Sequence, residues 1–79
     1  MNLYLLSQKV NTGYDTYDSC VVAAESAEDA RVIQPREIEF EQDEDFSFWV
    51  SPEHVTVTFL GRAAESIKRG AICSSFNAG

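Results

Sequence analysis

The sequence predicts a small α+β domain, with an antiparallel sheet of about four strands and one main helix packed on one face. Three observations predict it: short segments in which apolar and polar residues alternate, turn residues between them, and one alanine-rich segment with helical spacing. Along the chain these give strand, strand, helix, acidic strand or loop, strand, strand. With 79 residues, of which 44% are hydrophobic, we expect a single domain spanning residues 1–79.

The first two strands are expected to form a hairpin. Residues 2–10 are predicted to form a strand, in which Leu3 and Leu5 share one face and Tyr4 and Leu6 the other. Residues 11–13 (NTG) are typical of a turn, because glycine tolerates positive φ. Residues 19–24 (SCVVAA) read as a short apolar strand, and a turn between two such runs indicates a hairpin.

A capping serine, a proline and a strand-like alternation predict the helix and the last two strands. Ser26 is placed to cap a helix of about two turns, which Pro35 ends. Residues 54–60 (HVTVTFL) form the clearest alternating strand of the chain. Residues 63–69 are expected to add one helical turn, and residues 71–76 (AICSSF) a last strand.

An unusual concentration of negative charge lies between the helix and the third strand. Residues 37–45 (EIEFEQDED) hold six of the thirteen acidic residues, and five of the six occupy odd positions. In a strand this spacing would place a row of carboxylates on one face. The row either keeps other strands away from an exposed edge or binds a partner rich in lysine and arginine. We call these residues the acidic row: Glu37, Glu39, Glu41, Asp43, Glu44 and Asp45.

A second group of candidate binding residues lies in the predicted hairpin loop, where two tyrosines alternate with acids. Tyrosine offers a large contact area at low cost in entropy, so it is common at recognition surfaces. The same rings could instead cover one end of a small core. The candidates are Tyr14, Asp15 and Tyr17.

Composition argues against several functional classes. A net charge of −7 opposes direct binding to nucleic acid or to an anionic membrane surface. Residues 43–45 lack the glycine and spacing of an EF-hand loop, so we predict no metal site, and so short a chain leaves little room for a cofactor. The sequence contains no catalytic motif, and we expect no enzyme. A site built from His54 with Cys20 or Cys73 remains the enzymatic alternative.

The two cysteines and the N-terminus bear on the cellular compartment. Cys20 and Cys73 lack a CxxC spacing and lie in apolar runs, which favours reduced thiols over a disulfide between neighbouring strands. The first residues, MNLYLLSQ, lack the basic and long apolar regions of a signal peptide. We therefore expect a cytoplasmic protein.

Several segments together resemble short proteins of tailed phages and prophages: MNLYLLSQ, NTGYDTYDS, VVAAESAEDAR, VTVTFLG and SFNAG. Small, acidic, single-domain proteins of this origin are similar in kind to anti-CRISPR inhibitors of type I CRISPR complexes. The resemblance implies a phage-encoded anti-defence protein in the cytoplasm of the host bacterium. It would block DNA binding by covering a basic surface of the complex, as a monomer or small homo-oligomer. The alternative is a phage accessory or structural adaptor protein that binds through an apolar strand edge.

Overall fold

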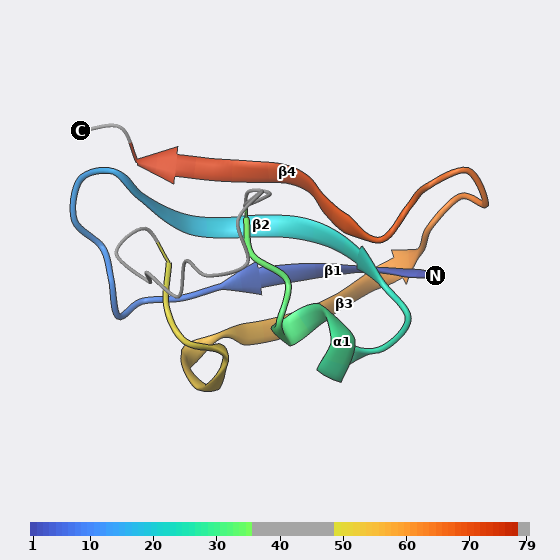
Figure 1. Cartoon of the computed structure of the whole chain (residues 1–79), viewed down its shortest axis with the longest axis horizontal. Helices are drawn as coiled ribbons and strands as arrows, with labels where there is room; N and C mark the ends of the chain where they lie inside the picture. Colours follow the sequence, from blue (N-terminus) through green and yellow to red (C-terminus); the bar gives the residue numbers. More distant parts are fainter. Residues whose placement is uncertain (36–48, 78–79) are drawn as a thin grey trace, which may run out of the picture.

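The computed structural model describes residues 1–35 and 49–77, and they contain one four-stranded antiparallel sheet with a short helix. The strand order is β3-β1-β2-β4, so β3 and β4 are the edge strands (Figure 1). The antiparallel sheet and the α+β class agree with the prediction from sequence. The elements are β1 (Asn2–Ser7), β2 (Thr16–Ala24), α1 (Ala27–Arg31), β3 (Thr56–Arg62) and β4 (Gly70–Asn77).

The central hairpin of β1 and β2 sets which side chains enter the core. Tyr4 lies opposite Val22 and Leu6 lies opposite Cys20, and all four are at most 5% exposed. Residues directly opposite each other across an antiparallel pair share a face, so this face is the buried one. The hairpin and its alternation confirm the prediction, although β1 ends at Ser7 rather than at residue 10.

One layer of chain covers this core face. It consists of α1, the residues that follow the helix, and Trp49 and Val50, which lie before the Pro52–His54 3₁₀ turn. Trp49 is the largest fully buried side chain of the described residues, at 2% exposed. The buried cluster comprises Tyr4, Leu6, Cys20, Val22, Ala24, Ala30, Ile33, Trp49, Val50 and Val55.

The helix is much shorter than predicted, so the expectation of a main helix of two turns was wrong. Ser26 caps it as expected, because its hydroxyl accepts a hydrogen bond from Asp29 N at 3.1 Å. The chain leaves the helix after Arg31, however, with the N–H of Ile33 bonded to the carbonyl of Ala30 at 3.0 Å. This bond spans three residues instead of the four of an α-helix, so the helix ends here, and Ile33 lies in the core at 7% exposed.

The edge strands differ from the prediction in two ways. Each contains one extra residue, Leu60 in β3 and Ile72 in β4, that interrupts the pairing with the inner strand. The strand predicted over residues 54–60 is β3 at Thr56–Arg62, so it continues through Gly61, which has a φ of +154°. Residues 63–69 form the connection from β3 to β4, with a single turn bond from Ile67 N to Ala64 O in place of the predicted helical turn.

The other face of the sheet carries small and half-buried side chains. Across the four strands, Thr58, Leu5, Val21 and Cys73 lie side by side in one row. Ser7, Ser19 and Ser75, with Thr56, form a neighbouring row of hydroxyl side chains. We call this surface the open face, because the cluster that covers the sheet lies on its other side.

A buried glutamine fixes the loop between β1 and β2. Gln8 is 4% exposed, and its Nε2 donates to the carbonyls of Asn11 and Tyr17 at 2.6 and 2.8 Å. Its Oε1 accepts from the backbone N–H groups of Val10 and Asn11 at 2.9 and 2.7 Å. Asn11 Nδ2 in turn donates to the carbonyl of Trp49. Both polar atoms of this buried amide are satisfied, which favours one loop conformation.

Replacing Gln8 should therefore destabilise the protein more than replacing an exposed neighbouring residue. We expect Gln8→Ala to lower the free energy of unfolding by about 2 kcal/mol or more, since it removes four hydrogen bonds around a buried amide. Lys9→Ala, at an exposed position, is the control and should change it by less than about 0.5 kcal/mol. Urea unfolding followed by tryptophan fluorescence measures both values. Equal stability of the two variants would contradict this role.

Candidate functional site: a negatively charged surface and the hairpin loop

The acidic row lies outside the described residues, but the residues on either side of it have defined positions. Ile33 and Pro35 are buried before residues 36–48, and Trp49 and Val50 are buried after them. Pro35 accepts a hydrogen bond from the Ser74 hydroxyl of β4 through its carbonyl oxygen. Both chain ends that border the acidic row are thus attached to the core face of the sheet.

The loop between β1 and β2 separates the two tyrosines predicted for binding. Tyr14 is 77% exposed, and Asp15 beside it is exposed with a φ of +59°, a conformation that aspartate adopts more readily than most residues. Thr16 Oγ1 closes the loop by donating to the carbonyl of Gly13 at 2.6 Å. Tyr17 instead packs on Phe76 of β4, with ring centroids 4.8 Å apart. Tyr14 and Asp15 are therefore exposed on the loop, whereas Tyr17 packs against the sheet.

Most carboxylates of the described residues have no basic partner there. Asp29 is the exception, since Arg69 binds it through Nε at 3.0 Å and Nη2 at 2.8 Å. Glu53 lies 3.7 Å from His54 Nε2, which is a charge pair only when the histidine is protonated. The remaining five form no ion pair within the described part of the chain: Asp15, Asp18, Glu25, Glu28 and Glu65.

Arg31 is committed to the backbone rather than to a carboxylate. Its Nη1 donates to the carbonyls of Pro52 and Val55 at 3.3 and 2.6 Å, and so joins the end of α1 to the start of β3. Sequence reasoning missed this role, as it missed that of Arg69, because the partners of both arginines lie far along the chain. It also missed Gln8, although the partners of Gln8 lie within nine residues. The three-residue spacing from Ser26 to Asp29 is the local signal that could have indicated a role for Asp29.

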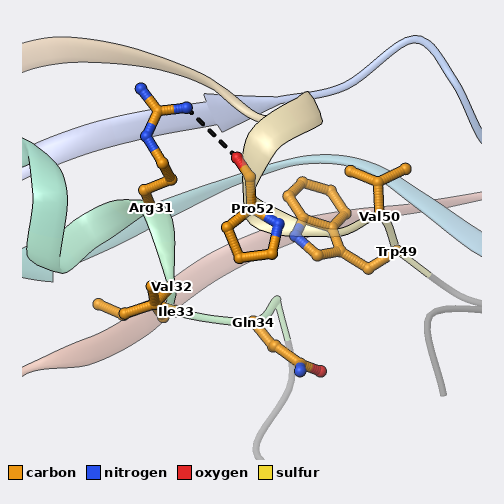
Figure 2. A pocket seen from close by; sticks show the side chains of 7 residues that line it. All are labelled: Arg31, Val32, Ile33, Gln34, Trp49, Val50 and Pro52. Carbon is orange, nitrogen blue, oxygen red and sulfur yellow. Dashed lines mark hydrogen bonds between the residues drawn. The ribbon is translucent and has the colours of Figure 1, made fainter. Parts of the chain in front are cut away.

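A shallow hollow lies between the end of α1 and Trp49, with a volume of about 170 Å³ (Figure 2). Its described lining contains no hydroxyl, thiol, imidazole or carboxylate, and it is smaller than the roughly 300–1,000 Å³ of typical ligand pockets. Figure 2 shows the Gln34 amide turned away from the indole of Trp49, and its Oε1 is buried with no partner among the described residues. The hollow can hold a small group but supplies no catalytic chemistry. Its lining residues are Arg31, Val32, Ile33, Gln34, Trp49, Val50 and Pro52.

The enzymatic alternative required a histidine close to a cysteine, and the described residues do not bring them together. Cys20 lies in the core, whereas Cys73 is exposed on β4. His54 precedes β3, at the opposite edge of the sheet from β4, three strand spacings or about 14 Å away. The two thiols face opposite sides of the sheet, because Cys20 pairs with Ser74 and Cys73 with Val21. Both thiols are free, as expected.

Neither metal ligands nor related proteins identify an activity. Within residues 1–35 and 49–77, no three His, Cys, Asp or Glu side chains gather in a way that could hold a metal ion. No helix in these same ranges is long and apolar enough to cross a bilayer. Comparison with protein-family models, curated proteins and solved structures finds no match for the chain.

The Asp29–Arg69 pair should make stability depend on pH. The hydrogen bonds from Arg69, followed by one from the N–H of Glu25, hold the pKa of Asp29 below its usual value. The stabilisation is therefore present above the unfolded-state pKa of about 3.9 and is lost as pH falls through the lower folded-state pKa. Because both side chains are partly exposed, we expect Asp29→Asn to cost at most about 1 kcal/mol at pH 7.

Chemical denaturation at pH 7 and pH 2.5 checks this dependence, with Glu28→Gln as the control at a neighbouring exposed carboxylate. The difference between wild type and Asp29→Asn should shrink at the lower pH. The same difference at both pH values would show that the ion pair does not cause it.

The two thiols should differ strongly in reactivity. Burial raises the pKa of Cys20 to about 12, so almost no thiolate forms at neutral pH, whereas Cys73 is exposed. In dilute native protein at pH 8, we expect one thiol to react rapidly with Ellman's reagent and the second only after denaturation. Cys73→Ser should remove the rapid phase and Cys20→Ala should keep it. Rapid modification of both thiols in the native protein would contradict this assignment.

Proposed function

We propose that this protein is a non-enzymatic, phage-encoded inhibitor that binds a basic surface of a host type I CRISPR complex and blocks its access to DNA. The observation that carries the proposal is the concentration of negative charge in the acidic row: residues 37–45 hold six of the thirteen acidic residues, in a chain of net charge −7. Exposed carboxylates of one sign attract a surface rich in lysine and arginine and speed association with it.

The spacing of the charges favours contact with individual basic side chains over imitation of DNA. On a strand, side chains of one face are about 6.6 Å apart, twice the rise of about 3.3 Å per residue. Duplex DNA carries one charge per about 1.7 Å of its axis. The acidic row, from Glu37 to Asp45, would be a dilute copy of such a backbone, but ion pairs with a few lysines and arginines need no higher density.

The hairpin loop adds a second contact to this proposal. Tyr14 and Asp15 are exposed on a loop that Gln8 and Thr16 hold in place. A loop fixed before binding loses little entropy when it binds, and a tyrosine beside a carboxylate suits a lysine or arginine side chain. In this proposal Tyr17 supports the loop by packing on Phe76 rather than by touching the partner.

Charge reversal in the acidic row tests the proposal. The variant Glu39→Lys, Glu41→Lys, Asp43→Lys adds two charges at each position and so changes the net charge from −7 to −1. We expect its affinity for a type I CRISPR complex to fall at least tenfold, or about 1.4 kcal/mol, and inhibition of DNA binding in a gel-shift assay to disappear with it. Raising the salt concentration to about 0.5 M should weaken the wild-type complex as well.

The matched control reverses three exposed carboxylates elsewhere: Glu25→Lys, Glu28→Lys, Glu65→Lys. It reaches the same net charge, so we expect a change in affinity of less than threefold. Equal loss in both triple variants would assign binding to overall charge and reject the acidic row. Absence of any binding by the wild-type protein would reject the type I complex as the target.

A further inference from the structure

The edge strand β4 has few of the features that usually keep other strands away; its bulge at Ile72 is one of them. It pairs with β2 on one side and has no neighbour on the other among the described residues (Figure 1). Its sequence, GAICSSFN, contains no charged residue and no proline, although 24% of the chain is charged. Ile72 and Phe76 are 48% and 46% exposed. Unpaired N–H and C=O groups along such an edge favour the addition of another strand.

The other edge strand, β3, is less suited to this role. Its extra residue, Leu60, is followed by Gly61 at a φ of +154° and by Arg62, so uninterrupted pairing is confined to its first four residues. In β4 the extra residue, Ile72, lies near the start, and Cys73–Asn77 continue without a bulge of their own. β4 therefore offers the longer regular edge.

We propose that a second copy of this chain occupies the edge, with the two β4 strands antiparallel about a two-fold axis that passes beside Cys73. Residues opposite each other across an antiparallel pair share a face, so the axis must pass through a residue pair and not between two residues. With the bulge counted as one position, Ser74 lies opposite Ala71 of the second copy and Ser75 lies opposite Gly70. These pairs match in face and use the whole of β4, about 26 Å long.

Charge complementarity supports a second copy as the occupant. Lys68, which precedes β4, is exposed and forms no ion pair among the described residues. In the proposed register it lies level with Asn77 of the second copy, whose neighbour on β2 is Thr16. Asp15 and Asp18 flank that end of β2, two strand spacings or about 10 Å away. Symmetry repeats this pairing of opposite charges on the other side of the axis, while the residues near the axis are neutral.

Substitutions at the axis test the interface by sedimentation analysis over a range of protein concentrations. Wild type and Cys73→Ser should form dimers, whereas Cys73→Asp should weaken the dimer at least tenfold, because it places two carboxylates opposite each other. Cys73 is exposed, so the aspartate should leave the fold intact, and circular dichroism checks this. Thr58→Asp, an exposed position of the same row on β3, should leave the dimer unchanged.

A wild type that stays monomeric up to millimolar concentration, or a Cys73→Asp variant that dimerises normally, would overturn the proposal. Loss of the dimer in Thr58→Asp alone would do the same and assign the interface to β3. Sedimentation measures self-association of this protein alone. Its outcome is therefore independent of the outcome for the proposed function, which is measured as binding to a type I CRISPR complex.

A charge swap tests the register. Lys68→Glu should weaken the dimer several-fold, and adding Asp15→Lys should restore it, because the two opposite charges are then exchanged. Mild oxidation should also link wild-type dimers through Cys73, and Cys73→Ser should prevent the link, since Cys20 is buried. A swap that fails to restore the dimer, together with no cross-link, would contradict the antiparallel arrangement.

Discussion

The described structure depends on the burial of one face of the sheet. A chain of 79 residues has enough apolar surface for a single core layer, and that layer forms where Trp49 and Ile33 lie on the central hairpin. Every large side chain at most 2% exposed belongs to this cluster. The helix contributes little to it, because Ala30 is its only buried residue. The core is therefore a sheet covered mainly by irregular chain.

Specific polar contacts hold that irregular chain in place. Gln8 fixes the hairpin loop and Asn11 ties it to the carbonyl of Trp49, while Arg31 joins the helix end to the start of β3. Arg69 connects the β3–β4 connection to the start of the helix through Asp29. Each of these side chains satisfies backbone groups or a charge that would otherwise need water. In this small domain the core is a single layer, and directional hydrogen bonds therefore help to fix one conformation of the chain that covers it.

The sequence predicted the elements whose signal is local and missed those set by distant contacts. Alternation identified the hairpin and the shared face of Tyr4 and Leu6, and Ser26 identified the helix start. Helix length was overestimated because the helical spacing continues to Ile33 and nothing local shows that the chain turns after Arg31. For the candidate site, the sequence predicted Tyr14 as a contact residue, and Tyr14 is exposed. It did not show that Tyr17 packs on Phe76, which lies 59 positions later in the chain. The acidic row lies outside the described residues, so its alternation stays a prediction.

The distribution of charge connects the two proposals. A net charge of −7 opposes self-association at most surfaces, since two copies repel each other within about a Debye length. The strand β4 carries no charged side chain and lies between Lys68 at one end and Asp15 and Asp18 at the other, so the strand itself adds no repulsion between two copies. A dimer formed there would carry two copies of the acidic row. Two linked copies of one binding surface raise the effective concentration of the second after the first has bound, so a dimer would strengthen the binding that we propose to a basic partner.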